Sequence, residues 1–394
     1  MNQQTPSGAS RPKNRKALII RAAGTLFYQR GYAAVGMSEI AASVGIAPSA
    51  LYRHFRGKEE LLKAVIENSL SQIITPIEQL KSNPEADSPE IWASYFAEVA
   101  LNSREAGVLW RRESRRLPAE ELELLQARIS FMQHELAAKV RSFRAEAGGW
   151  AELLARAQLS VFASISFHRT NLRRDLFSAL LADIVLSVLK IKLPENSFLT
   201  TETERRPTDS VLSTREQLLA VGAELFAERG FAAVSTGEVA AAVGIAGPSI
   251  YHHFSSKSEI LFLSLERAGA RLRSKLEEVL ATAADASEAL NALMRSYLKM
   301  ILEEPHLIIL LITELDHLSQ DSKEVIRAEQ RDYVSRWVGL LRELHPELDE
   351  ESAWIRAHAS ITVINQRLGG RREALRSGEL AGITSICQAI LRLT

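Results

Sequence analysis

Apolar residues recur every three to four positions along most of the chain, which is the spacing of one face of an α-helix. Near the start, Lys16–Arg30 has this spacing and is followed by Gly31, which suits a helix C-cap. The same spacing continues through Leu153–Ile165 and Leu180–Leu189. No run of alternating apolar and polar residues predicts a β-strand, so the pattern predicts an all-α fold.

The residues after Gly31 predict two short helices joined by a tight turn. The first helix has Ile40, Ala41 and Val44 on its inward face, and Gly45 allows the turn that follows, with Ile46 plugging the interface between the two helices. Pro48 opens the second helix, Ser49–Phe55, where its missing N–H costs nothing. The expected inward residues of this helix are Leu51 and Phe55, and the expected outward residues are Ser49, Arg53 and His54. Two short helices around a glycine turn form a helix-turn-helix, whose second helix can enter the DNA major groove.

The whole unit occurs twice. The segment Leu26–Leu62 repeats 199 residues later without a gap, with 20 identities in 37 aligned positions. A fixed register of this length indicates a duplication rather than chance similarity. Between the copies, Leu193–Ser213 contains Pro194, Pro207 and a polar run, and this composition predicts a linker.

These observations divide the chain into six segments. They are a disordered tail (1–12), a first helix-turn-helix head (13–63), a first helical domain (64–192), the linker (193–212), a second head (213–262) and a second helical domain (263–394), and the family resemblance described next implies that the two helical domains are regulatory and dimerisation domains.

The two heads resemble the TetR family of DNA-binding regulators. In the first copy the resemblance rests on Phe27, Gly31-Tyr32, Glu39-Ile40-Ala41, Gly45-Ile46, Leu51-Tyr52-Arg53-His54-Phe55 and Lys58-Glu59-Glu60-Leu61-Leu62. In the second copy it rests on Phe226, Gly230-Phe231, Glu238-Val239-Ala240, Gly244-Ile245, Ile250-Tyr251-His252-His253-Phe254 and Lys257. The tandem layout is similar to that of double-TetR regulators of lipid and steroid catabolism in mycobacteria and their relatives.

The resemblance implies DNA contacts at matching positions of both heads. In the first head these positions are Pro48, Ser49, Ala50, Tyr52, Arg53, His54 and Lys58. In the second head they are Gly247, Pro248, Ser249, Tyr251, His252, His253 and Lys257. Tyrosine, histidine and lysine would contact phosphates, and the residues that open the second helix would reach bases or backbone. The alternative is that the tyrosines only pack on the helices and that the histidines are solvated.

Family members often place a threonine where it caps the first of the two short helices and contacts a phosphate. The second copy has Ser235 at this position, whereas the first has Gly36. We expect Ser235 to cap its helix and Ser38 to substitute in part in the first head.

The net charge of zero argues against nucleic-acid binding, but the charges are unevenly distributed. From Arg11 to Lys63 there are ten Lys and Arg against three acids, a net charge of +7. From Arg205 to Phe262 there are five against six, a net charge of −1. Because neutralised phosphates supply much of the affinity for DNA, the first head should bind DNA more strongly. The basic run Arg11–Lys16 would serve as a minor-groove arm or as a solvated tail.

The resemblance also implies a four-helix interface between the last two helices of each half. The matching segments are Trp150–Asn171 with Leu172–Ile191 and Ser352–Gly369 with Glu373–Thr394. Paired within one chain, they predict an intramolecular pseudo-dimer whose recognition helices read adjacent major grooves of an imperfect palindrome. Pairing of whole chains into a higher oligomer stays an alternative.

Each regulatory domain would enclose a small-molecule effector site. The candidate lining residues are Trp92, Tyr95, Phe96, Trp110, Phe131 and Phe162 in the first half, and Met294, Tyr297, Met300, Tyr333 and Trp337 in the second. The alternative is that these residues form the ordinary helical core. Arg111–Leu117, weakly echoed by Thr313–Leu318, resembles TetR members that respond to acyl-CoA or steroid-CoA ligands.

The remaining composition narrows the function class. Hydrophobic residues make up 46% of the chain, enough for buried cores, and neither a signal peptide nor a membrane span is expected. A single cysteine, Cys387, excludes an internal disulfide, and there is no phosphate loop, nucleophile elbow or metal-spaced histidine pair. We therefore expect a cytoplasmic repressor without catalytic residues, metal or cofactor, which binds an operator in double-stranded DNA. The competing hypothesis is a regulator in which only the first head binds DNA and the second recruits a protein or has a structural role.

Overall fold

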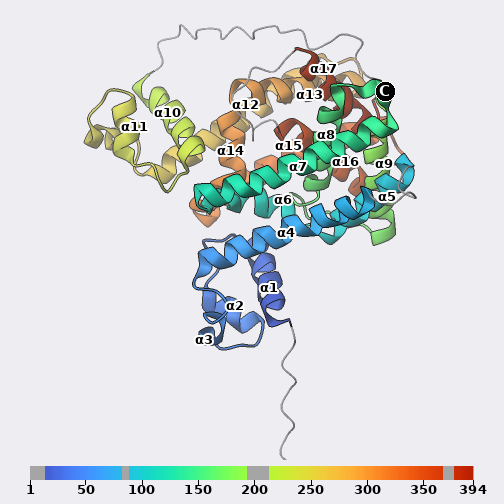
Figure 1. The fold of residues 1–394 in the computed structure, drawn as a ribbon. Helices are drawn as coiled ribbons and strands as arrows, with labels where there is room; N and C mark the ends of the chain where they lie inside the picture. The colour runs from blue at the N-terminus through green and yellow to red at the C-terminus, as the bar shows by residue number, and fades with distance from the viewer. Residues whose placement is uncertain (1–13, 82–87, 193–212, 367–376, 394) are drawn as a thin grey trace, which may run out of the picture.

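The computed structural model describes residues 14–81, 88–192, 213–366 and 377–393, and all of its regular elements are helices. The expected tail (1–12) and linker (193–212) lie outside the described residues. Two small helical heads project from a larger helical body (Figure 1). The first head is at the bottom of this view and the second at the upper left, both away from α9 and α17.

The first head follows the predicted order of helices. Its elements are α1 (Arg15–Arg30), α2 (Met37–Ser43), α3 (Pro48–Leu51) and the start of α4 (Lys58–Lys81). The first helix ends at Gly31 with a φ of +81°, a conformation that glycine adopts without strain. The α-helix α3 is shorter than the predicted Ser49–Phe55, because the chain tightens after Leu51: Arg53 and His54 donate their N–H groups three residues back.

The second head repeats these elements. They are α10 (Thr214–Arg229), α11 (Thr236–Ala242), the 3₁₀-helix η5 (Gly247–His252) and the start of α12 (Lys257–Thr282). Its small core includes the buried side chains of Leu218, Phe226, Ile250 and Phe254. The equivalent residues of the first head, Ile19, Phe27, Leu51 and Phe55, are buried too.

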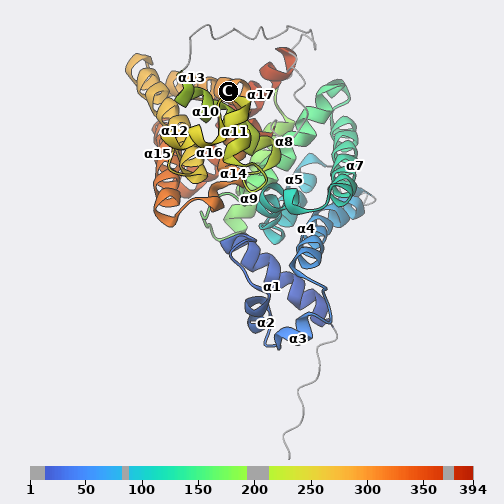
Figure 2. The ribbon, with the colours of Figure 1, turned by 90° about the vertical axis from the view of Figure 1, so that its left-hand side faces the viewer.

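The body is built from the two remaining helix sets. The first set comprises α5 (Pro89–Asn102), α6 (Ala106–Val108), η2 (Leu109–Glu113), η3 (Ser114–Arg116), α7 (Ala119–Phe143), η4 (Ala145–Ala147), α8 (Trp150–Ser164) and α9 (Arg174–Leu189). The second comprises α13 (Ala286–Glu303), α14 (Pro305–Thr313), η6 (Leu315–His317), α15 (Gln320–Leu344), α16 (Glu350–Asn365) and α17 (Ser377–Ile390). Figure 2 shows the second set beside the first, above the first head.

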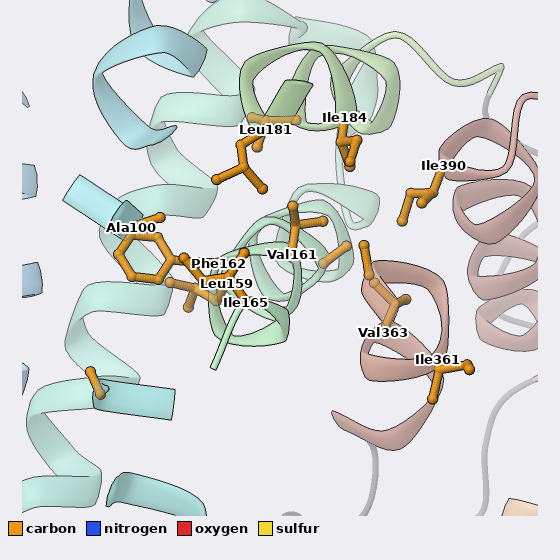
Figure 3. Packing of buried hydrophobic residues seen from close by; sticks show 14 of the residues in the cluster. Ala100, Leu159, Val161, Phe162, Ile165, Leu181, Ile184, Ile361, Val363 and Ile390 are labelled. Carbon is orange, nitrogen blue, oxygen red and sulfur yellow. The ribbon is translucent and has the colours of Figure 1, made fainter. Parts of the chain in front are cut away.

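The last two helices of each half meet in the centre of the body. Helix α8 contacts α16 and α17, and α9 contacts α17. In Figure 3, Val161 of α8 lies between Ile184 of α9 and the pair Val363 and Ile390 of the second half. Two predicted bounds were wrong: α8 ends at Ser164 rather than Asn171, and α16 ends at Asn365, while residues 367–376 lie outside the described part.

Candidate nucleic-acid interface

The first head presents a polar surface on top of two apolar anchors. Leu51 and Phe55 are buried at 0% and 1% exposure, which fixes the turn of chain between them against α1 and α4. Gly45, with a φ of +66°, makes the turn that brings α3 beside α2. The residues with exposed side chains at this surface are Pro48, Ser49, Tyr52 and Arg53, while Ala50 and His54 are half-buried.

The second head presents the equivalent surface. Pro248, Tyr251 and His252 are exposed, and Gly247, Ser249 and His253 are half-buried. The hydroxyl of Tyr251 lies 3.1 Å from that of Thr236, at the start of α11, so the two form a hydrogen-bonded pair at the surface. The first head has Met37 at the matching position, and its Tyr52 is 54% exposed. Both heads can therefore offer a tyrosine to a phosphate, but only the second holds its ring in place through a hydroxyl.

The two lysines that the family resemblance marks as phosphate contacts also serve the heads themselves. The Lys58 ammonium lies 4.1 Å from the centre of the Tyr32 ring, and that of Lys257 lies 4.2 Å from the centre of the Phe231 ring. Lys257 further donates to the carbonyl oxygens of Phe231 and Val234, at 2.6 and 2.7 Å. Partial burial lowers the pKa of both lysines. A phosphate contact by either lysine stays a prediction.

The helix cap differs between the heads as the sequence predicted. The Ser235 hydroxyl accepts from the N–H of Glu238, whose carboxylate accepts in return from the N–H of Ser235, a complete capping box. In the first head Gly36 occupies this position and α2 has no side-chain cap. Ser38 does not supply the cap, because it lies inside α2, past the cap position, and its part in a phosphate contact stays a prediction.

Two basic residues lie at the recognition surface: Arg215, which the sequence analysis did not single out, and Lys16, which it placed in the basic run Arg11–Lys16. The Lys16 ammonium lies 5.4 Å from the centre of the Phe55 ring, and the Arg215 guanidinium lies 4.8 Å from that of Phe254. Both cations therefore sit beside the end of the second short helix. The register of the repeat was the available signal, because the two positions are 199 residues apart and both carry a positive charge.

In the first half, three of the predicted effector-site residues form part of the aromatic core. The rings of Trp92 and Phe96 are 6.1 Å apart, and Phe96 meets Phe162 edge-on at 5.1 Å. The Trp92 indole donates to the Gln158 side chain at 3.2 Å. Figure 3 shows Phe162 pointing to the α5 side of α8, near Ala100. Tyr95 and Trp110 are half-buried, and Phe131 is 56% exposed.

In the second half, Tyr297, Tyr333 and Trp337 form a cluster with ring centres 6.0 to 6.2 Å apart. The Tyr297 hydroxyl donates to the side chain of Asn365 at 2.9 Å. Met294 is buried and Met300 is half-buried. Burial raises the pKa of both tyrosines. These residues are packed against one another as a core is.

A small pocket opens between α4, α5 and α7 of the first half. Its lining residues are Ile74, Ile77, Glu78, Trp92, Phe131, Met132, Glu135 and Lys139. It thus brings together two of the predicted residues, Trp92 and Phe131. The walls are mainly apolar, with Glu78, Glu135 and Lys139 among the lining residues. Helix α4 forms one wall and also contacts α1 of the first head, so the pocket borders the element that carries this head.

Two further features bear on the function class. None of the described helices is long and apolar enough to cross a membrane. Within the described ranges, no three His, Cys, Asp or Glu side chains are grouped as a metal site requires.

Comparison with known proteins matches three segments of the chain. Residues 19–65 and 218–263 match the model of the bacterial regulatory proteins of the tetR family. Residues 283–360 match a tetracyclin repressor-like C-terminal domain. The two heads and part of the second body segment thus match the same kind of protein.

The matched relatives are regulators of about half the length of this chain. The transcriptional repressor KstR2 of Rhodococcus jostii is 30% identical over 32% of this chain and 63% of its own length. KstR2 of Mycolicibacterium smegmatis is 29% identical over 44% of this chain and 91% of its own length. The solved structure of the ketosteroid transcriptional regulator KstR2 of Mycobacterium tuberculosis has 25% identity and a TM-score of 0.40, covering 47% of this chain and 97% of that one.

Proposed function

Because this chain belongs to the TetR family of bacterial regulatory proteins in a tandem form, we propose that it is a single-chain transcriptional repressor. In this proposal the two heads bind the two half-sites of one operator in double-stranded DNA, and a small hydrophobic or acyl-CoA-like effector releases them. The observation that carries the proposal is the presence of two complete helix-turn-helix heads on one interlocked helical body.

The contacts between the halves support an intramolecular pseudo-dimer. Arg156 of α8 pairs with Glu379 of α17 at 2.9 Å, and Arg356 of α16 pairs with Asp183 of α9. Each half thus supplies one arginine from its first interface helix and one acid from its last helix. This reciprocal exchange is what a two-fold interface produces, here between two parts of one chain. Because the two halves belong to one chain, their covalent connection replaces the association of two subunits.

The close approach of α8 and α17 supports the same conclusion. A Cβ atom on Gly382 would lie 2.3 Å from the Trp150 ring and 2.6 Å from Leu153, so only glycine fits there. The Ser160 hydroxyl of α8 also donates to the Gln366 side chain, just after α16. Such specific packing is typical of a permanent interface rather than a transient contact.

The charge of the heads supports DNA binding by the first head in particular. Among the described residues of this head, the exposed Arg53 and Arg56 flank the recognition turn. A second candidate function follows from the other head, whose net charge is −1 and whose Lys257 ammonium is already bound to backbone carbonyls. In that alternative only the first head binds DNA, and the second is a protein-interaction or structural module.

The effector assignment rests on the aromatic residues and on the relatives. The pocket beside Trp92 and Phe131 has mainly apolar walls, which favours a hydrophobic effector. The KstR2 relatives are named as repressors, which favours repression here.

A footprint on the DNA that flanks the coding region, combined with analytical ultracentrifugation of the complex, tests the proposal. We expect one chain to protect two adjacent half-sites. Protection of a single half-site by one chain would support the alternative in which the second head does not bind DNA. Two chains on the two half-sites would replace the intramolecular pseudo-dimer by pairing of whole chains.

The effector part has its own test on the same complex. A panel of acyl-CoA and steroid-CoA thioesters is added to the protein–DNA complex, and release is followed by fluorescence anisotropy of the labelled DNA. We expect at least one thioester to release the DNA. If none does while the footprint is as expected, the effector class is wrong and the DNA-binding part stands.

A further inference from the structure

Each head is anchored to the body by one buried glutamate. Glu113, whose side chain is 1% exposed, accepts from the backbone N–H of Tyr32 at 3.1 Å. Glu314, 8% exposed, accepts from the backbone N–H of Phe231 at 3.2 Å. The two glutamates are equivalent, because α7 and α15 begin at the same spacing after them, at Ala119 and Gln320. The carboxylates thus hold the same point of both heads, the turn after the first helix.

The first head has a second anchor, an arginine from its own half. Arg112 donates to the carbonyl oxygens of Phe27 and Tyr28, in the last turn of α1, and to Glu113 at 2.6 Å. The Phe27 carbonyl also accepts from the N–H of Gly31, so Arg112 adds a second donor there, and its positive charge opposes the negative end of the helix dipole. The Arg112 side chain therefore links the end of α1 to Glu113.

The second half has no arginine at this position. The residue equivalent to Arg112 is Thr313, which has a shorter side chain. Its hydroxyl is within hydrogen-bond distance of the Ile309 carbonyl oxygen and of the Glu314 carboxylate, to which it donates. In the second head, the guanidinium that contacts the last turn of the first helix comes from the first half of the chain. Arg115 of η3 donates to the carbonyl oxygen of Ala227 at 2.5 Å, and its other nitrogen donates to the hydroxyl of Thr313 at 3.0 Å. The same nitrogen lies 3.5 Å from Glu314.

The equivalent contact in the other direction, from the second half to the first head, is made by an acidic residue. Asp316, the equivalent of Arg115, reaches from the second half to the first head, where its carboxylate lies 4.0 Å from the Arg112 guanidinium. It also packs against Gly31, where an added Cβ would lie 2.5 Å from a carboxylate oxygen. A dimer of identical chains would have the same residue at both crossing positions. Here one position is basic and the other acidic, a division that the fused chain permits.

We propose that Arg115 is a positioning residue. It belongs to the first half of the chain and holds the second head on the body. Contacts run from α1 through η2 and α14 to α10, and η3, which carries Arg115, contacts η2 on this path between the two heads. The orientation of the second recognition element then depends on the first half. The consequence for DNA rests on the proposed function, but the anchoring itself does not.

Hydrogen–deuterium exchange on the full chain without DNA tests the anchoring. In Arg115→Ala, the amides of residues 227–231 lose a charge-assisted anchor and should exchange about tenfold faster, while residues 28–32 keep their rate. The matched control is Arg112→Ala, which should accelerate residues 28–32 and leave residues 227–231 unchanged. Equal acceleration of both segments by Arg115→Ala, or none in residues 227–231, would overturn the proposal.

A rescue separates positioning from general loss of packing. Thr313→Arg places a guanidinium in the second half at the position that Arg112 has in the first. Combined with Arg115→Ala, it should restore slow exchange at residues 227–231, whereas Arg115→Lys, with a single ammonium, should restore it only in part. Failure of the double variant to slow exchange, with its thermal unfolding unchanged, would show that the arginine does not act through this anchor.

The DNA consequence is read separately by footprinting of Arg115→Ala. We expect protection of the second half-site to weaken while the first stays protected. If exchange responds as expected but protection of the second half-site is unchanged, the anchor is real and DNA binding by the second head does not depend on it. If the wild-type chain protects no DNA at all, the proposed function fails and the anchoring result is unaffected.

Discussion

The two heads have nearly the same core and different surfaces. Phe27 and Phe226 are both fully buried, and the anchors of the recognition turn are Leu51 and Phe55 in one head and Ile250 and Phe254 in the other. The surface positions between these anchors have changed: Arg53 corresponds to His252, and Gly36 to Ser235. Close packing constrains buried side chains strongly, whereas exposed positions tolerate most substitutions. The comparison shows which positions keep the fold of a head and which are free to change its chemistry.

The heads also differ in how they are stabilised. The second head has a capping box at α11 and another at α10, where the first head has no side-chain caps at α2 and α1. The first head instead has an arginine anchor from its own half, while the second borrows one. The second head is thus better capped locally and more dependent on the other half for its position.

The largest expected effect comes from removing the central ring of either head. Phe27→Ala and Phe226→Ala should each destabilise their own head by about 3–5 kcal/mol. We expect Phe27→Ala to abolish operator binding and Phe226→Ala to leave a footprint of half the length, because the first head has the larger positive charge. Circular dichroism melting and footprinting measure both effects. Loss of all binding in both variants would show that the heads contribute equally.

Substitutions of the surface charges should give the next largest effect. Arg53→Ala and Arg56→Ala in the first head should each reduce the salt dependence of binding, by about one unit of the log–log slope if the side chain neutralises a phosphate. His252→Ala in the second head should leave this slope unchanged. The slope is measured by anisotropy titrations at several salt concentrations. Equal changes in the two heads would contradict the expectation that the first head binds DNA more strongly than the second.

Substitution of Lys257 tests whether this lysine contacts DNA or only stabilises the second head. Because Lys257 already donates to two carbonyl oxygens, Lys257→Ala should lower thermal stability as well as any DNA affinity, and Lys257→Arg should not restore the compact contact with the Phe231 ring. A change in affinity without a change in stability would assign this lysine to DNA alone.

The helix caps should give a smaller difference. Ser235→Ala removes the cap of α11 and should cost about 1 kcal/mol, while Gly36→Ser should stabilise the first head by only a few tenths of that amount. Chemical denaturation of the two variants measures the effects. A stability change of the same size in both would mean that a serine cap contributes equally to the two heads.

The smallest expected effect is a pH dependence confined to the second head. Hydrogen bonds from the Ser235 backbone and from the Arg229 and Ser235 side chains lower the pKa of Glu238 from 4.5 to about 2. A lowered carboxyl pKa stabilises the folded head above about pH 4.5, and this contribution is lost as the pH falls towards 2. Solvent weakens the effect because the side chain is 42% exposed.

Glu238→Gln tests this dependence by thermal melting between pH 6 and pH 2.5. The variant should lose the second head's extra sensitivity to acid and keep that of the first head. The matched control is Glu39→Gln, which removes the equivalent carboxylate beside Arg30. An unchanged pH profile in Glu238→Gln would show that the capping box does not set the acid response.

Much of the candidate site could be predicted from the sequence because it depends on local patterns. The helical spacing, the turn at Gly45 and the serine cap at Ser235 are set by residues within one or two turns of each other. The repeat then transferred the helices and the turn to the other head, but not the serine cap, because the first head has Gly36 at that position. Ser38 does not cap α2, because it stands two positions after the cap residue Gly36 and therefore lies inside the helix.

The rest was decided by tertiary structure, where residues far apart in sequence meet. Arg115 and Thr313 are 198 positions apart, and no pattern in either segment indicates that they pair. The same holds for Arg156 with Glu379. Sequence periodicity states which side of a helix is buried but not which helix covers it. The sequence by itself thus determined the helices, the two heads and the family, and only the packed chain decided how one half holds the other.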